Sequence, residues 1–172
     1  MPESGDERIV EELVDQVLAA TISGSGGDLP DAAREEMQIL GEAIRKLPAP
    51  KQDQLFLLLK GHSDSLVRTD LHQCQALCAA MELLAAVVAE IRHQALVQRA
   101  VGNAYAIGQS DFERGLEAYD QAGMLYAGLG MELEQAVTVT GKLYALMNLG
   151  RYNQAFQEGR WASQVKPRLV TP

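Results

Sequence analysis

The chain has 172 residues, enough for one domain with a substantial core, and it is 47% hydrophobic but only 5% aromatic. This composition suits closely packed helices better than a β-sandwich. The net charge of −8 comes entirely from the first half: residues 1–92 hold 8 Lys and Arg against 16 Asp and Glu, and residues 93–172 hold 7 of each. An acidic surface without a basic stripe argues against nucleic acid as a partner.

Targeting and membrane signals are not evident in the sequence. Its first residues, MPESGDERIVEE, are acidic and polar, unlike a signal peptide. The most apolar run, residues 77–91, is too short to span a membrane and contains Glu82. Two cysteines do not make a disulfide framework in a chain of this size. We therefore expect a cytoplasmic protein without a membrane partner.

Residues 1–27 are predicted to form an amphipathic helix followed by a flexible linker. Ser4 and Glu7 match a capping box, and a helix over residues 6–21 follows them. Its apolar stripe consists of Ile9, Val10, Leu13, Val14, Val17 and Leu18. The sequence SGSGGD at residues 23–28 favours a flexible break. Two outcomes stay open: the helix docks on its own chain, or it is a free arm that binds a partner or a second copy.

Residues 28–64 are predicted to be a helical extension. Asp28 is a candidate cap for the first helix of this segment. The buried face of that helix is expected to hold Met37, Leu40, Ile44 and Leu47.

Pro48 and Pro50 are expected to end that helix and to begin a short third one over residues 51–60. Its centre, residues 55–59, is a run of five apolar side chains, which predicts burial nearly all round the helix. Residues 61–63 are expected to form a turn.

Residues 65–90 are predicted to be helical, with a break near Thr69 and Asp70. Their apolar residues alternate spacings of four and three, which is typical of a heptad seam between two helices. The seam consists of Val67, Leu71, Cys74, Cys78, Met81, Ala85 and Val88. It fits the second helix of a degenerate repeat, with a dimeric coiled coil as the alternative. Both cysteines are then core residues, because His72 and Cys74 point in different directions and no further ligands complete a metal site.

One sequence pattern occurs twice, over residues 95–126 and 136–165. When Phe112 is aligned with Tyr152, the second halves match at a spacing of 40 residues, and the first halves match at 41. Further matched pairs are Leu116 with Phe156, Ala122 with Ala162 and Leu125 with Val165. A unit that recurs every 20–50 residues is typical of a stacked-repeat protein.

Each copy is predicted to be a hairpin of two helices, over residues 92–127 and 132–165. Gly108 is expected to stop the first helix, and Ser110 or Asp111 to cap the next one. Glycine inside a helix costs about 1 kcal/mol relative to alanine, so small residues there indicate a close approach of two helices. These residues are Gly102, Ala104, Gly115 and Ala122, and the matching Ala162 is also expected to be buried.

The first hairpin resembles a tetratricopeptide repeat (TPR) in Gly102-Asn103-Ala104-Tyr105, Asp111-Phe112, Gly115, Tyr119 and Ala122. The second is similar to the turn and second helix of a TPR in Leu149-Gly150-Arg151-Tyr152, Ala155 and Ala162. It departs from the family at Leu143, where Gly is usual, and at Gly159, where an aromatic residue is usual. The resemblance implies an all-α fold, a right-handed α-α superhelix of stacked hairpins over residues 65–172, behind an N-terminal helical extension.

The spacing of the units, with YAGLGMELEQA between them, is similar to the extended repeats ahead of caspase-like CHAT domains in bacterial proteins. That similarity implies an alternative role, as the N-terminal regulatory repeat region of a larger CHAT-type protease or signalling protein. The catalytic Cys and His would then lie beyond Pro172. Within the chain no motif matches a catalytic site, and GSGG lacks the strand and the GK[ST] of a phosphate loop. We expect no enzyme activity, cofactor or metal ion.

The TPR resemblance implies a protein or peptide partner, held in a concave groove that the first helices of successive hairpins line. It places Arg99 and Asn103 in this groove, where peptide-binding TPRs grip a carboxylate or a backbone. The second hairpin adds Val137, Thr140, Tyr144, Met147 and Asn148. The other residues of a full carboxylate clamp are not evident. The alternative is that Arg99 and Asn103 are ordinary exposed polar residues and that Tyr144 and Met147 pack on a neighbouring helix.

Pro167 is expected to end the last helix. Stacked-repeat proteins normally end in a polar capping helix, and none is evident here. The second hairpin is therefore predicted to expose an apolar face. Either the chain belongs to a longer array, or that face binds something, such as a second copy in a homodimer. A self-associating structural protein is therefore a third possible role, besides the scaffold and the regulatory region.

Overall fold

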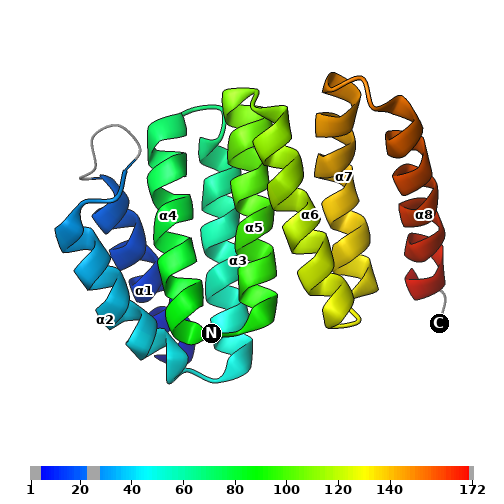
Figure 1. Ribbon diagram of the computed structural model, residues 1–172. Coiled ribbons are helices and arrows are strands. Elements are labelled where there is room, and N and C mark those ends of the chain that lie inside the picture. Colours follow the sequence, from blue (N-terminus) through cyan, green and yellow to red (C-terminus); the bar gives the residue numbers. More distant parts are fainter. Residues whose placement is uncertain (1–4, 23–27, 171–172) are drawn as a thin grey trace.

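The computed structural model describes residues 5–22 and 28–170, and the side chains of residues 8–22 and 28–165. The capping box at Ser4 and Glu7 and the break at residues 23–27 lie outside the described side chains. Within this part of the chain every regular element is a helix, which confirms the all-α class (Figure 1). The elements are α1 (Gly5–Ile22), α2 (Asp31–Arg45), α3 (Ala49–Leu66), α4 (Leu71–Val88), α5 (Ile91–Asn103), η1 (Ala104–Gln109), α6 (Phe112–Gly128), α7 (Glu132–Asn148) and α8 (Tyr152–Val170).

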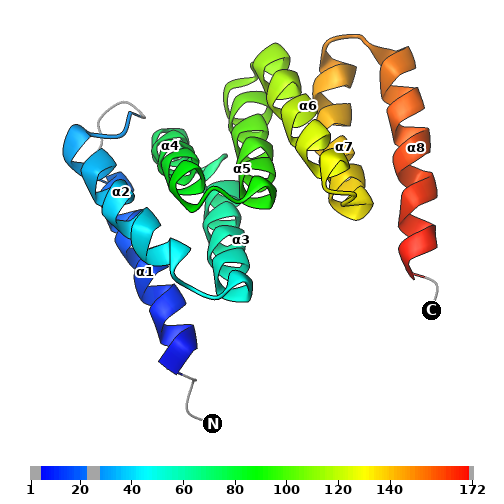
Figure 2. The same ribbon diagram turned by 60° about the horizontal axis from the view of Figure 1, so that its bottom comes forward.

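The helices pack mainly on their neighbours in the sequence. From α4 to α8 each helix contacts the next one, so the chain runs up and down as a row of hairpins (Figure 1). Alternate helices also touch, because α3 packs on α5 and α5 packs on α7. Figure 2 shows the row from the α1–α2 end to the α8 end. The helices α3, α5 and α7 therefore share one face of the row.

Of the two outcomes open for α1, the structure shows the docked helix. It packs on α2, α3 and α4. Val10, Val14 and Val17 are buried, and their spacing of four and three places them on one face. Ile9, which the sequence assigned to the same stripe, is 43% exposed because it lies beside that face.

The start of α2 differs from the prediction. Pro30 is its N-cap residue, and no side chain caps the helix, so Asp28 does not have the predicted role. The fixed φ angle of proline suits the entry to a helix. Of the four residues predicted to be buried, Met37, Leu40 and Ile44 are confirmed, whereas Leu47, just beyond the end of α2, is half-buried.

The third helix is longer than predicted, because α3 continues through residues 61–63, where we expected a turn. Ser63 is buried there, with its Oγ 3.6 Å from the Sγ of Cys74 on α4. This packing outweighs the cost of one helical glycine, about 1 kcal/mol. The apolar run is also less buried than predicted: Leu57 and Leu58 are 59% and 39% exposed, because neighbouring helices do not surround α3.

The helix α4 lies at the centre of the largest core cluster. Every seam residue except the half-buried Leu71 is buried, and the predicted break before it is confirmed, since the Oδ1 of Asp70 accepts a hydrogen bond from the N–H of Gln73 at 3.0 Å. By length and composition, α4 is the one helix of the described chain that could cross a membrane. Half of its residues are buried against other helices, which is equally typical of a core helix.

The first helix of the first hairpin does not stop at Gly108. It continues as η1, a π-helical turn, and ends where Ser110 adopts a left-handed φ of 57°. Gly108 instead permits close packing, because a Cβ atom there would lie 2.5 Å from the Cδ1 of Leu71. Asp111 caps α6 as predicted: its Oδ1 accepts a hydrogen bond from the N–H of Arg114 at 3.2 Å.

The turns after α6 and α7 are alike. Gly130 and Gly150 have positive φ angles of 68° and 72°, the left-handed conformation that commonly ends a helix. The helix α8 then runs through Pro167, where we predicted its end. Proline removes one backbone hydrogen bond, but this loss falls in the last turn of α8, which packs on α7.

The predicted close approach of helices within the hairpins is confirmed. A Cβ atom on Gly115 of α6 would lie 2.7 Å from the Cβ of Ala106. Ala122 and Ala162 are both buried, at corresponding places in the two hairpins.

Candidate functional site

The face shared by α3, α5 and α7 is organised around Tyr119 of α6. The Tyr119 ring is 2% exposed and lies between two glycines, Gly102 of α5 and Gly141 of α7. Its hydroxyl donates a hydrogen bond to the Oδ1 of Asn103 at 2.7 Å. The Nδ2 of Asn103 donates to the Oδ1 of Asp64 on α3 at 2.8 Å. Burial raises the pKa of Tyr119, so the hydroxyl stays a donor.

Asn103, one of the predicted groove residues, is therefore engaged within the chain. Its amide connects α6 to α3 through two hydrogen bonds. One N–H of the amide and one lone pair of its oxygen remain for other contacts. The sequence could not reveal this network, because its members are 16 and 39 residues from Asn103.

Arg99, the other groove residue of α5, lines a pocket of about 230 Å³. The pocket lies among α3, α5, α6 and the start of α7, and its other lining residues are Asp53, Leu57, Arg92, His93, Leu96, Tyr126, Met131 and Glu134. Arg99 is half-buried and takes part in none of the ion pairs found among the described side chains. Burial raises the pKa of Tyr126, and the positive charge of Arg99 opposes that rise.

The second arginine of this pocket already has a partner. The Nε of Arg92 lies 2.7 Å from the Oδ1 of Asp53, and the same oxygen lies 2.7 Å from the Nε2 of His93. His93 is buried and stacks on Phe56, with ring centroids 4.3 Å apart. Burial lowers the pKa of His93, and the hydrogen bond to Asp53 opposes this effect. Among the described lining residues, Arg99 is thus the one positive charge without an ion pair, and Tyr126 is its polar neighbour.

The predicted residues on α7 are exposed but lie outside the Arg99 pocket. Thr140, Tyr144, Met147 and Asn148 all face solvent. The Tyr144 ring packs edge-on against Phe112, with centroids 5.8 Å apart, and the Nδ2 of Asn148 donates to the carbonyl oxygen of Tyr144 at 2.8 Å. Since α5 and α7 are in contact, these residues continue the same face. The structure therefore brings Arg99 and Asn103 together on α5 and places the α7 residues on the adjacent helix.

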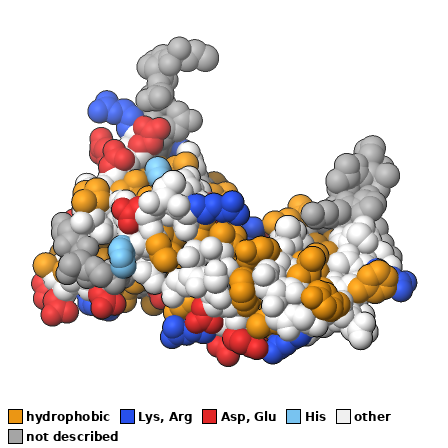
Figure 3. Space-filling model, turned by 90° about the horizontal axis from the view of Figure 1, so that it is seen from above, with side chains coloured by type: hydrophobic (Ala, Val, Ile, Leu, Met, Phe, Trp, Pro, Cys, Tyr) orange, Lys and Arg blue, Asp and Glu red, His pale blue; other side chains and the backbone are white. Residues whose placement is uncertain are grey.

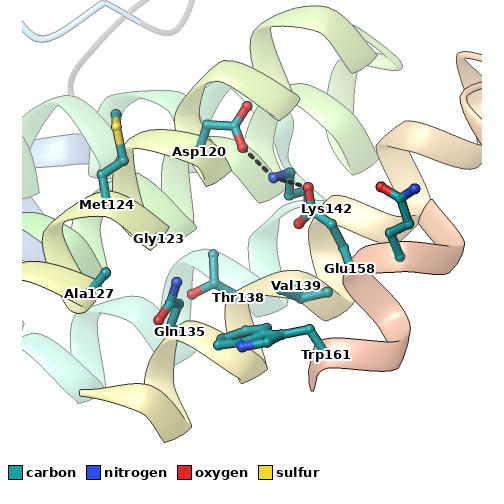
Figure 4. A pocket seen from close by; sticks show the side chains of 11 residues that line it. Asp120, Gly123, Met124, Ala127, Gln135, Thr138, Val139, Lys142, Glu158 and Trp161 are labelled. Atoms are coloured by element: carbon teal, nitrogen blue, oxygen red, sulfur yellow. Dashed lines mark ion pairs between the residues drawn. The ribbon is translucent and has the colours of Figure 1, made fainter. Parts of the chain in front are cut away.

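Sequence reasoning missed a cleft of about 410 Å³ among α6, α7 and α8 (Figure 4). Lys142 of α7 lies between Asp120 of α6 and Glu158 of α8 and forms ion pairs with both. Burial lowers the pKa of Lys142, but the hydrogen bonds to the two carboxylates outweigh burial and raise it. Trp161 extends from α8 across α7 at the other end of the cleft. No regular spacing in the sequence connects the three charged residues, since each comes from a different helix.

The cysteines lie in the core, as predicted. Cys74 and Cys78 are buried, one turn apart on α4, and both Sγ atoms lie close to the Oγ of Ser63. A hydrogen bond from Cys78 lowers the pKa of Cys74 to about 7, whereas the pKa of Cys78 itself is raised. Among the residues that the structure describes, no group of three or more His, Cys, Asp or Glu side chains could hold a metal ion.

Comparison of the chain with protein-family models, with curated proteins and with solved structures finds no match.

Proposed function

We propose that the protein is a TPR-like interaction scaffold, which holds a peptide or a helix of a partner protein on the face formed by α3, α5 and α7. The proposal includes a right-handed α-α superhelix, with this face as its concave side. The two matched hairpins and the contacts of α3 with α5 and of α5 with α7 support it. The role is binding in the cytoplasm, without catalysis and without a cofactor.

The half-buried Arg99, which forms no ion pair with any described side chain, is the observation that carries the proposal. An arginine in a pocket binds a carboxylate through two parallel hydrogen bonds. The neighbouring Leu57 is 59% exposed and offers apolar contact beside that charge. Glu134 at the same pocket disfavours a second negative group. We therefore expect a ligand with one carboxylate, from an acidic side chain or a chain end, next to an apolar residue.

The exposed side chains of α7 extend this surface. Tyr144 and Met147 are 47% and 57% exposed, and Thr140 lies one turn before Tyr144. An aromatic and a flexible thioether side chain suit adaptable apolar contacts with a peptide. Asn103 contributes mainly by holding α3, α5 and α6 together, so we assign the direct contacts to Arg99, Tyr144 and Met147.

The experiment is a selection of peptides from a display library on the wild-type chain, followed by affinity measurements on synthetic peptides. Selected peptides should share a carboxylate near an apolar residue. Arg99→Ala should weaken their binding by about tenfold or more. The matched control is Arg68→Ala, since Arg68 is exposed in the turn before α4.

Two results would contradict this assignment. The first is a set of selected peptides that lack any common carboxylate. The second is binding that survives Arg99→Ala but is lost with Trp161→Ala, which would move the site to the cleft among α6, α7 and α8.

A further inference from the structure

A second apolar surface lies at the end of the row of helices. It is a groove of about 500 Å³ between α7 and α8, lined chiefly by Leu143, Met147, Tyr152, Ala155, Phe156 and Gly159. Tyr152 and Phe156 are each 67% exposed, which is unusual for two neighbouring aromatic residues on a protein surface. Viewed from above, the α8 end shows hydrophobic and neutral side chains with few charges (Figure 3).

The same groove in the preceding hairpin is filled by a helix. There α7 packs between η1 and α6 and covers the partly buried Phe112, together with Leu116 and Tyr119. The repeat aligns Phe112 with Tyr152 and Leu116 with Phe156. The exposed groove on α7 and α8 therefore has the form that accommodates a helix antiparallel to α8.

In the first hairpin the small residue lies on the first helix and the large residue on the second helix, and in the second hairpin this order is reversed. In the first hairpin Gly102 leaves room for Tyr119, whose ring would be 2.6 Å from a Cβ at residue 102. The matching pair in the second hairpin is Leu143 and Gly159, and a Cβ at residue 159 would lie 3.6 Å from the Cδ1 of Leu143. A helix that fills the second groove can therefore place a large side chain opposite Gly159.

The α8 helix itself has the required pattern. Tyr152, Phe156, Gly159 and Ser163 follow one another at spacings of four, three and four, so they form one stripe along the helix. The two large residues come first and the two small residues last. If a second α8 lies antiparallel, Phe156 faces Gly159 of the second copy and Tyr152 faces Ser163 of the second copy, and the reverse contacts form as well.

We propose that this groove binds a second copy of the chain, in a two-fold symmetric dimer with antiparallel α8 helices. A two-fold interface must be self-complementary, and the order large, large, small, small meets this condition. In this register Arg160, whose guanidinium lies 6.0 Å from the Phe156 ring, is opposite the small residue Ala155 of the second copy. The groove is short, so the interface lies near the lower limit of specific complexes, roughly 1,200 Å². The dimer therefore dissociates on dilution. The groove shares Met147 with the proposed peptide-binding face, so the test uses Phe156 and Gly159, which lie outside that face.

The test is sedimentation of the full chain at several concentrations, with each variant first shown to be folded by circular dichroism. Wild type should dimerise, and Phe156→Ala should weaken the dimer by about tenfold or more. Gly159→Phe should also weaken the dimer, because it places a phenylalanine ring against the Phe156 ring of the second copy. The double variant Phe156→Ala/Gly159→Phe should recover an affinity within about threefold of wild type, since it restores a large residue opposite a small one. Ile39→Ala is the control, because Ile39 is 71% exposed on the distant α2.

A wild-type chain that is monomeric at every concentration would overturn the proposal and leave the groove to a helix of another protein. A dimer that neither single variant weakens would overturn it as well, because the contact would then lie elsewhere. Failure of the double variant to recover would exclude the antiparallel register on which the proposal depends.

Discussion

The ring of Tyr119 lies so close to Gly102 that a β-carbon at residue 102 would be 2.6 Å from its Cε1 atom. On the other side, a β-carbon at Gly141 would be 2.6 Å from the Cζ atom of the same ring. One aromatic side chain of α6 thus sets the distance of that helix from α5 and from α7. Neither glycine has a positive φ angle, so packing alone explains their presence.

The first prediction concerns this contact. Gly102→Ala should lower the free energy of unfolding by up to about 2 kcal/mol, because an overpacked methyl group costs about 1–3 kcal/mol and alanine regains about 1 kcal/mol of helix propensity. The ring cannot move away, since Gly141 holds its other side. Urea unfolding measures the change.

The matched control is Gly123→Ala. Gly123 is also inside a helix, α6, but a β-carbon there would meet no atom of a neighbouring element within 4 Å. This variant should gain up to about 1 kcal/mol. If both substitutions stabilise the chain equally, the close contact between α5 and α6 does not exist.

The hairpins could be predicted from the sequence because their contacts are local. Gly115 and Ala122 lie on α6, directly after the helix that they approach, so a recurring small residue is visible as a pattern. The same holds for the seam on α4 and for the cap at Asp111. The predicted helix boundaries are wrong where tertiary contacts determine the end of a helix. Residues 61–63, for example, stay helical because Ser63 is buried against α4.

The candidate surfaces were less predictable. The sequence suggested Arg99 and Tyr144 as surface residues only through the resemblance to a TPR, and in the structure Tyr144 is exposed whereas Arg99 is half-buried. The network from Tyr119 through Asn103 to Asp64 depends on three helices meeting, and no spacing encodes it. The cleft that Lys142 crosses was missed for the same reason, since its two carboxylates come from α6 and α8.

The second prediction separates the structural role of Asn103 from a binding role. Asn103→Ala should lower the free energy of unfolding by about 1–3 kcal/mol, because it leaves the buried Tyr119 hydroxyl without its acceptor. Tyr119→Phe removes the same hydrogen bond together with the hydroxyl and should cost less, about 1 kcal/mol. Chemical denaturation of both variants tests this order. An Asn103→Ala variant as stable as wild type would mean that Asn103 is not structural and is free to contact the ligand directly.

The third prediction concerns pH. The pKa of buried His93 is lowered from its ordinary value of 6.5, so the unfolded chain binds a proton more readily than the folded chain. Stability should therefore fall as the pH drops through about 6.5, and level off once the pH is below the folded pKa. A charged ring would also present an N–H at Nδ1, which has no partner among the described protein atoms.

Thermal unfolding between about pH 7.5 and 5.5 checks this dependence. In His93→Leu the fall in melting temperature over this range should be clearly smaller, because the group that titrates in the core is gone. His62→Gln changes an exposed histidine of α3 and should keep the wild-type dependence. Equal slopes in wild type and His93→Leu would show that another group is responsible.

The fourth prediction concerns the end of α4, where Ala89 adopts a left-handed φ of 62°. This conformation costs about 1–2 kcal/mol for a residue with a β-carbon but not for glycine. Ala89→Gly should therefore stabilise the protein by about 0.5–1 kcal/mol, after allowance for the greater freedom of glycine in the unfolded chain. Ala86→Gly, an exposed change inside the same helix, should destabilise it by about 1 kcal/mol. Since the two variants have the same composition, opposite shifts in melting temperature isolate the backbone effect, whereas shifts of the same sign would mean that α4 ends at a different residue.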